Sequence, residues 1–203
     1  MKNVIDHPIT QKSFAVIDKE IGEHNFTEAE YAIVRRVIHS TADFEFSQLV
    51  EFTPNAIEGA IAYLSQGHPI ITDVGMVKQG IISMVNKTFG NPILSAVAQV
   101  KEALPGKTRT ETGILTLFSQ YPQSIYVIGN APTALLSLCE QIQTSPLKPT
   151  LVIGAPVGFV SVLESKQALV RTDVPKILIR GRKGGSPVAA AILNALLALS
   201  VQK

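Results

Sequence analysis

The segment from Ser124 to Glu164 constrains the fold most, because it contains the same structural unit twice. Each copy is a run of β-branched and apolar residues that ends in a glycine and soon reaches a proline. The two copies are Tyr126–Thr133 and Leu151–Gly158, with Pro132 and Pro156. A proline suits the first position of a helix, where an N–H has no partner. Each unit therefore predicts a strand, a tight turn and a helix, the pattern of a parallel α/β sheet. Ligands of such sheets bind at the carboxyl ends of the strands, so we expect both turns to border a site.

Apolar periodicity predicts further elements on both sides of this segment. We expect an extended arm over 1–12, helices over 13–21, 27–41, 52–67, 76–85, 108–119 and 189–199, and strands over 68–75 and 174–179. Residues 92–100 fit either a strand that runs into a helix or a helix alone. Thr27 and Glu30 form a capping box at the start of their helix, and Thr108 is a candidate N-cap. The last helix is apolar nearly all round, so it is expected to be buried against the sheet or a partner subunit.

Composition indicates one large core. The chain has 203 residues, of which 46% are hydrophobic and 17% charged. We expect a single domain over 1–203, with an N-terminal arm and helices over 1–66 and an α/β core over 67–203. So apolar a chain is also expected to form an oligomer. A net charge of +2 with scattered basic residues argues against nucleic acid as a partner. The most apolar stretch, 188–201, is shorter than the ~20 residues of a membrane span. The N-terminus lacks the apolar segment of a signal peptide, and Cys139 is the one cysteine, so we expect a cytoplasmic protein without disulfides.

A cluster of polar side chains is the first chemical signal. Arg35, Arg36 and His39 fall together on one face of the helix that starts after Thr27, and Asp43 joins them if the helix continues that far. A histidine placed between cations and a carboxylate can donate or accept a proton near neutral pH. The alternative is the ordinary solvated face of an amphipathic helix.

A glycine-rich basic segment is the second signal. Residues 180–186, Arg-Gly-Arg-Lys-Gly-Gly-Ser, lead from the final strand to the last helix, where cations and free N–H groups suit an anion. The alternative is an exposed turn. Arg109 lies in the first turn of a helix, where the helix dipole disfavours a cation, although a solvated arginine explains it as well. Glu164 and Lys166 fit ordinary solvated charges. The sequence contains no Walker A, GxGxxG, CxxC, HExxH or GxSxG motif, so nothing in it predicts a metal site or a serine nucleophile.

Short motifs occur in order along almost the whole chain: His7-Pro8-Ile9, Lys12-Ser13-Phe14, Ile17-Asp18, Arg36-Val37-Ile38-His39 with Asp43, Thr72-Asp73 with Met76-Val77 and Gly80, Thr108-Arg109, Gly129 to Leu135, Pro156 to Val160, Glu164-Ser165-Lys166 and Gly181 to Ser186. Together they resemble the precorrin-8X methylmutase family of cobalamin biosynthesis (cobalt-precorrin-8 methylmutase in the anaerobic route). Any one of them is weak, but their order over the full length is specific. Ala42 stands where the family usually has glycine.

The resemblance implies a three-layer α/β/α, flavodoxin-like fold, with a parallel sheet of about five strands and an N-terminal helical extension. It also implies a homodimer and an isomerase that needs no cofactor and no metal of its own. The reaction is a [1,5]-sigmatropic shift of a methyl group from C-11 to C-12 of a tetrapyrrole. Precorrin-8X or cobalt-precorrin-8 becomes hydrogenobyrinic or cobyrinic acid. His39 is implied as the proton donor or acceptor. The substrate contacts expected with it are Ser13, Arg36, Asp73, Arg109, Asn130, Thr133, Ser165, Lys166, Gly184 and Ser186.

Two other classes of function stay open. One is a corrinoid-binding protein that passes the product on without catalysing its formation. The other is an unrelated α/β enzyme that uses residues 180–186 for a phosphate-bearing ligand. The first class would keep its ligand affinity in a His39→Ala variant but would have no turnover to lose. The second would bind nucleotides or sugar phosphates and ignore tetrapyrroles.

Overall fold

One six-stranded sheet forms the centre of the computed structural model, which describes residues 7–201. The strand order is β1–β6–β5–β4–β2–β3, and all neighbours are parallel except β1 and β6, which are antiparallel. The strands are β1 Val50–Phe52, β2 Ile70–Thr72, β3 Ile93–Ser95, β4 Ile125–Ile128, β5 Leu151–Gly154 and β6 Lys176–Ile179. The expected α/β class with a largely parallel sheet is confirmed, and β1 makes the sheet one strand wider than expected.

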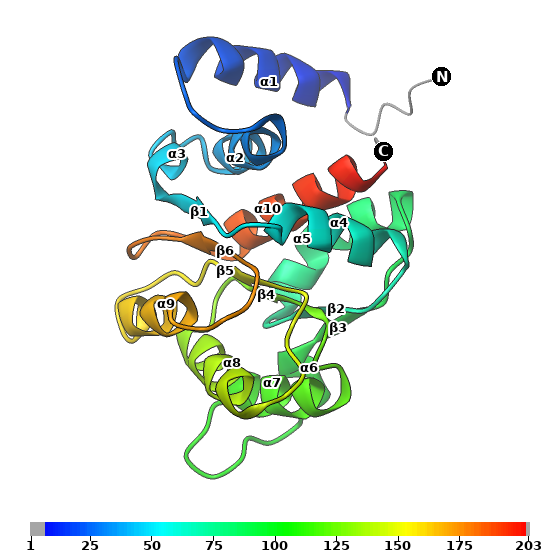
Figure 1. The fold of residues 1–203 in the computed structure, drawn as a ribbon, viewed down its shortest axis with the longest axis vertical. Coiled ribbons are helices and arrows are strands. Elements are labelled where there is room, and N and C mark those ends of the chain that lie inside the picture. Colours follow the sequence, from blue (N-terminus) through cyan, green and yellow to red (C-terminus); the bar gives the residue numbers. More distant parts are fainter. Residues whose placement is uncertain (1–6, 202–203) are drawn as a thin grey trace.

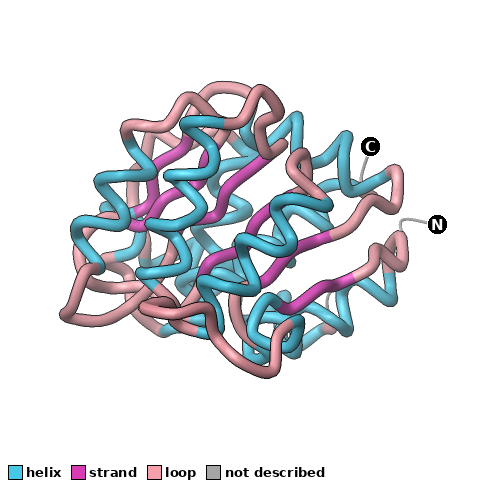
Figure 2. The backbone as a smooth tube through the Cα atoms, turned by 90° about the horizontal axis from the view of Figure 1, so that it is seen from below, coloured by secondary structure: helices cyan, strands magenta, loops and turns pink. Residues whose placement is uncertain are grey.

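Helices cover both faces of the sheet (Figures 1 and 2). They are α1 Pro8–Glu20, α2 Glu28–Thr41, α3 Phe46–Leu49, α4 Ala56–Ser65, α5 Gly75–Lys87, α6 Ala96–Gln99, α7 Arg109–Gln120, α8 Pro132–Thr144, α9 Val162–Val170 and α10 Ser186–Ser200. Helices α4, α5 and α10 pack on one face, and α6, α7, α8 and α9 on the other. Helix α2 packs outside α10, and α1 lies on α2 (Figure 1). The helical extension is therefore an additional layer beyond the three of the core.

The central strands are buried on both sides, as their continuous apolar sequence predicts. In β4, Ile125 and Val127 join the core that faces α10, whereas Tyr126 and Ile128 join the core that faces α8. Helix α10 is apolar all round because it lies between the sheet and α2 of the same chain. Its composition therefore needs no partner subunit to explain it. No helix of residues 7–201 is long and apolar enough to cross a membrane.

The helix starts show where local chemistry is sufficient for prediction. Thr27 and Thr108 both cap their helices, each in a reciprocal capping box with the glutamate three residues later. Pro132 occupies the first turn of α8, as predicted. Helix α2 ends at Ala42, which adopts the left-handed conformation at φ 53° that glycine favours.

Three sequence-based expectations are corrected. Residues 8–12 are helical and belong to α1, and the arm expected at 1–6 lies outside the described residues. Residues 50–52, expected among the N-terminal helices, form β1. Pro156 does not open a helix, because α9 begins only at Val162. The Ala155 N–H donates to Ile128 and its carbonyl accepts from Gly185, so the chain continues alongside its neighbours before it turns.

Candidate functional site

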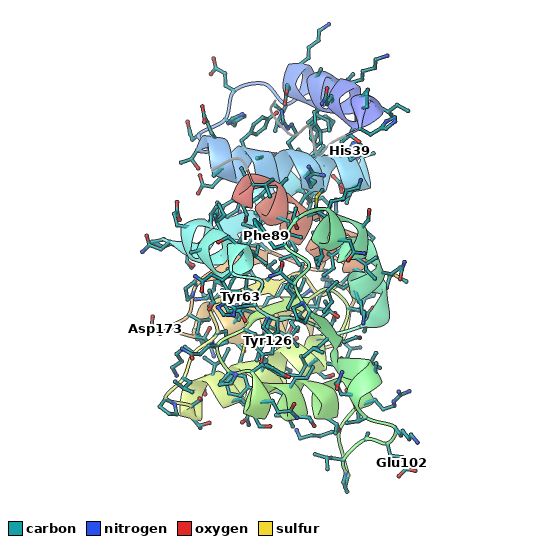
Figure 3. All side chains as sticks on the ribbon, turned by 90° about the vertical axis from the view of Figure 1, so that its right-hand side faces the viewer. His39, Tyr63, Phe89, Glu102, Tyr126 and Asp173 are labelled. Carbon is teal, nitrogen blue, oxygen red and sulfur yellow. The ribbon has the colours of Figure 1, made fainter. Side chains whose placement is uncertain are left out.

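His39 is exposed in the last turn of α2, on the side that faces α1 (Figure 3). Its Nδ1 atom lies 2.8 Å from the Ser13 hydroxyl oxygen of α1. The Phe14 ring packs edge-on against the imidazole, with ring centroids 5.5 Å apart. Because Ser13 engages Nδ1, the other ring nitrogen, Nε2, is the one that can exchange a proton with a ligand. Neighbouring side chains of α1 thus orient the imidazole predicted as the proton-transfer group.

The two arginines beside His39 have different surroundings. Arg35 binds the Asp18 carboxylate of α1 at 2.9 and 3.1 Å, and its guanidinium lies 4.4 Å from the centroid of the Phe14 ring. The Tyr31 hydroxyl donates to the same carboxylate, and burial together with Asp18 raises the pKa of Tyr31 to about 12. Arg35 therefore fastens α1 to α2. The Arg36 guanidinium carbon lies 5.4 Å from the Phe14 centroid, next to the histidine.

Asp43 does not join this cluster, contrary to the expectation for a longer helix. The left-handed Ala42 turns the chain, and the Asp43 carboxylate binds the Lys183 ammonium at 2.5 Å. Glu45 binds the same ammonium at 2.6 Å. Hydrogen bonds from Lys183 and from the Glu45 N–H hold the pKa of Asp43 below its usual range. The end of α2 is thereby joined to residues 180–186, which we call the basic loop.

The basic loop follows β6 at the carboxyl edge of the sheet. Its carbonyls at Gly181 and Lys183 both accept from the Lys166 ammonium, and Gly158 N–H donates to the Arg182 carbonyl. The Arg180 guanidinium binds the Glu51 carboxylate at 3.0 Å and the Gln48 carbonyl at 2.6 Å. Two of its three cations are therefore engaged by the protein, which makes the loop a poorer phosphate site than its sequence suggests.

Asp73 joins two neighbouring strand ends. Its buried carboxylate accepts from the backbone N–H groups of Asn130 at 2.6 Å, Ala131 at 2.8 Å and Val74 at 2.9 Å. Burial raises the pKa of Asp73, and the backbone N–H donors act in the opposite direction. Asp73 was expected at the substrate, but the structure places it inside the protein, where it holds the turn between β4 and α8.

The remaining predicted residues divide into buried and accessible ones. Ser165 and Lys166 were expected to contact the substrate. Ser165 is fully buried and donates to the Val162 carbonyl, and Lys166 is only 3% exposed, so neither side chain presents a polar atom to a ligand. Ser186 is also buried, at the start of α10, and a Cβ on Gly184 would lie 2.3 Å from the Ala155 oxygen. These residues shape the base of the loop.

The accessible residues lie farther along the carboxyl edge. Asn130 is exposed after β4. The half-buried Thr133 hydroxyl lies 3.4 Å from that of Thr108. Arg109 is exposed, and its guanidinium donates to the Val97 and Val100 carbonyls, which fastens the segment that follows β3. The structure thus groups Ser13, Arg36 and His39 closely, and it leaves Asn130, Thr133 and Arg109 in a second group nearer β2 and β4.

Two features of the site carry no local sequence signal. The contact of Lys183 with Asp43 and Glu45 joins residues about 140 positions apart. Phe159 and Val160 are 88% and 82% exposed on the segment between β5 and α9. In the sequence they belong to a family motif, but nothing there indicates that these apolar side chains are exposed. Both features lie beside the basic loop, since Gly158 bonds to Arg182.

Pockets elsewhere do not involve the predicted residues. An open cavity of about 390 Å³ lies at the amino ends of the strands, lined in part by Tyr63, His68 and Ser124. Another of about 280 Å³ lies beside β1 and β6, lined in part by Glu51 and Lys176. Within residues 7–201, no three His, Cys, Asp or Glu side chains are grouped so that they could hold a metal ion.

Comparisons with known proteins assign the class. Residues 8–199 match the family model described as precorrin-8X methylmutase. The chain is therefore of the methylmutase class, the isomerases that move a methyl group within one molecule. A cobalt-precorrin-8 methylmutase of Synechocystis sp. is 52% identical over 97% of both chains. One of Leptospira interrogans is 40% identical over 96% of this chain and 94% of its own.

Solved structures agree with the sequence relatives. The crystal structure of precorrin-8X methyl mutase from Thermus thermophilus superimposes with a TM-score of 0.87 at 38% identity, over 97% of this chain and 98% of the other. This chain belongs to the precorrin-8X methylmutase family. Its substrate is accordingly a tetrapyrrole, and its reaction is a methyl shift in cobalamin biosynthesis.

Proposed function

We propose that this enzyme moves the methyl group from C-11 to C-12 of cobalt-precorrin-8 or of metal-free precorrin-8X, giving cobyrinic or hydrogenobyrinic acid. The observation that carries the proposal is the exposed imidazole of His39, held by Ser13 at 2.8 Å with Arg36 one turn of α2 away. A sigmatropic shift needs a firmly positioned substrate and a group that transfers a proton, and it needs no protein nucleophile. The relatives at 52% and 40% identity carry the cobalt substrate in their names, so this form is the first to test.

Each accessible residue has a role in this proposal. His39 exchanges a proton with the macrocycle through Nε2, while Ser13 fixes the orientation of the ring. Arg36 binds a peripheral carboxylate of the substrate, because a guanidinium and a carboxylate form strong charge-assisted hydrogen bonds. Asn130 and Thr133 bind further polar substituents. Asp73, Ser165 and Lys166 are not proposed as contacts, since their polar atoms are buried and bonded to the protein.

The second part of the proposed site is the basic loop with its apolar neighbours. Gly184 and Ser186 shape the loop, and Arg109 stabilises the segment after β3 at the other end of the carboxyl edge. Phe159 and Val160 present apolar surface close to these polar groups. A tetrapyrrole has an apolar ring with carboxylates around its rim, and this combination of surfaces suits it.

We also propose that the enzyme acts as a homodimer. Large exposed apolar side chains usually mark a surface that another molecule covers, and Leu163 extends the apolar surface of Phe159 and Val160, so we propose that the partner subunit borders the substrate there. Light scattering coupled to size-exclusion chromatography tests this, and a monomer at micromolar concentration would refute it. The cytoplasmic location expected from the sequence stays a prediction.

Turnover tests the proposed function directly. Purified protein is mixed separately with cobalt-precorrin-8 and precorrin-8X, and the visible spectrum is followed for the wild type, His39→Ala and His68→Ala. We expect the wild type and His68→Ala to convert at least one form, and His39→Ala to be slower by about 10²- to 10⁴-fold, the usual contribution of a proton-transfer group. His68 is the matched control, since it is an exposed histidine at the opposite edge of the sheet.

Other outcomes would identify another function. Binding of the corrinoid product without any conversion would indicate a carrier protein. If tetrapyrroles do not bind but phosphate-bearing ligands do, the basic loop serves a different substrate class. Equal turnover by the wild type and His39→Ala would support the proposed reaction but refute the proposed role of His39 in proton transfer.

A further inference from the structure

Lys166 is a buried cation on α9 that the reaction itself does not require. Its side chain is 3% exposed, and its ammonium donates to the Gly181 and Lys183 carbonyls at 2.7 Å each. Burial lowers the pKa of Lys166 to about 8, so the ammonium is still the main form at pH 7. Burying a charged group costs free energy unless hydrogen bonds compensate for it. The two short hydrogen bonds from Lys166 to one loop therefore call for an explanation.

The basic loop needs such a fastening. Gly181, Gly184 and Gly185 all have positive φ angles. Glycine adopts many backbone conformations with similar energy, so these three residues do not by themselves hold the loop in one conformation. Together with the Gly158 N–H on Arg182, the two bonds from Lys166 engage three successive carbonyls of the loop. The path of residues 181–183 is thus determined by groups outside the loop.

This path decides where the Lys183 side chain goes. Lys166 holds the Lys183 carbonyl, and the Lys183 ammonium binds Asp43 and Glu45 just beyond the end of α2. Asp43 is four residues after His39 and directly follows Ala42, the residue that caps α2. A continuous series of contacts therefore runs from α9 through the basic loop to the helix that carries the imidazole.

We propose that Lys166 is a positioning residue for the methyl shift. It does not touch the substrate. It holds the basic loop in a conformation in which Lys183 binds the residues that follow α2, and this contact keeps the His39 imidazole at the correct position relative to the bound macrocycle. This inference rests on the proposed function, in which His39 transfers the proton. Misplacing a reacting group by about 1 Å can reduce a rate about 10²-fold, so such an anchor has a measurable effect.

Lys176 provides a matched control. It is also buried, its pKa is also lowered by burial, and its ammonium also donates to two carbonyls, those of Val170 and Thr172. These bonds lie at the amino end of β6, the end opposite to the basic loop. Lys176→Met therefore removes a similar buried ammonium without freeing residues 180–186.

The experiment compares Lys166→Met, Lys176→Met and Lys183→Met with the wild type. Three quantities are measured: the steady-state constants for the substrate that the wild type converts, thermal unfolding, and amide hydrogen exchange of residues 180–186. For Lys166→Met we expect at least a tenfold fall in kcat/KM, mainly in kcat, with faster exchange in the loop. Lys176→Met should stay within twofold of the wild type in kcat/KM. Lys183→Met breaks the exposed half of the link without touching the core, and it should also lower kcat.

Coupling between the two lysines distinguishes positioning from a general effect. If Lys166 acts through Lys183, the double variant should lose little more activity than the worse single variant. The proposal is overturned if Lys166→Met keeps kcat/KM within twofold, if Lys176→Met is equally damaged, or if the losses of the single variants multiply. It is also overturned if activity falls while exchange in the loop is unchanged.

Failure of the proposed function would look different. A wild type that converts neither tetrapyrrole removes the reaction for which Lys166 is said to position His39. Hydrogen exchange would still report whether Lys166 holds the loop, because that measurement needs no substrate. If Lys166→Met does not fold, Lys183→Met alone decides, and unchanged kcat in that variant refutes the proposal.

Discussion

Replacing Gly184 with alanine tests how firmly the conformation of the basic loop is determined. Gly184 has a φ of +150°, which side chains rarely adopt, and a Cβ there would lie 2.3 Å from the Ala155 carbonyl oxygen. The two segments would have to separate by about 0.7 Å before that distance reaches 3.0 Å. The hydrogen bond from Gly185 N–H to the same oxygen would then stretch from 2.8 Å to about 3.5 Å, beyond the usual range.

The magnitude follows from these two effects. A backbone conformation restricted to glycine costs a substituted residue about 1–3 kcal/mol. Loss of the hydrogen bond adds about 0.5–1.5 kcal/mol. We therefore expect Gly184→Ala to lower the free energy of unfolding by about 1.5–4.5 kcal/mol. Gly181→Ala is the control, since its φ is also positive at +70° but nothing lies within 4 Å of an added Cβ. It should cost only about 1 kcal/mol.

Urea unfolding followed by circular dichroism measures both changes. The same samples should show that Gly184→Ala loses at least tenfold in kcat/KM, while Gly181→Ala keeps most of it, because only the first displaces the loop. Equal losses of stability in the two variants, within about 0.5 kcal/mol, would show that the close approach to Ala155 is not a real constraint.

Three further predictions concern single residues. Ala42→Gly should raise the free energy of unfolding by about 1 kcal/mol in urea titration, because Ala42 has φ 53° at the end of α2, and no gain would contradict the strain. Asp43 has its pKa lowered by Lys183, so its contribution to stability is present above the unfolded pKa near about 4 and is lost as pH falls below it. Urea unfolding should therefore show a difference between the wild type and Asp43→Asn at pH 6 that vanishes in acid. Burial raises the pKa of Cys139 to about 12, so a thiol reagent at pH 8 should label it only after unfolding, and rapid labelling of the native protein would refute its burial.

The elements that the sequence predicts well are those with local causes. Thr27 and Thr108 cap their helices through residues only three positions away, and Pro132 suits the first turn of α8. Strand β1 has no such cause. It is three residues long, lies between two helices, and pairs with β6 about 127 positions later. Pro156 repeats the pattern of Pro132 locally, but hydrogen bonds of Ala155 with Ile128 and Gly185 prevent the same turn.

In the candidate site, too, some positions follow from local patterns and others depend on contacts between distant segments. Helical spacing alone places Arg36 and His39 on one face, and the resemblance to a known family adds Ser13, which the structure brings within 2.8 Å of the imidazole. The position of Asp73 at a strand end was predictable. Its burial depends on β4 lying next to β2, which no local pattern indicates. Lys166 looked like a solvated helix charge for the same reason, since the carbonyls that bind it lie in a loop 15 to 17 residues away.

The place of α10 in the core has a consequence for synthesis on the ribosome. This helix follows the other described helices in the chain, and it packs against α2, α4 and α5, all of which precede residue 88. Until α10 emerges, those helices lack the element that covers much of their apolar surface, and mainly α1, α3 and the sheet are available to pack against them. Nascent chains that end before Ser186 should therefore remain incompletely folded and attract chaperones, whatever the intrinsic stability of their early helices. A chain cut within α10 would accordingly lose packing first around helices that were synthesised much earlier.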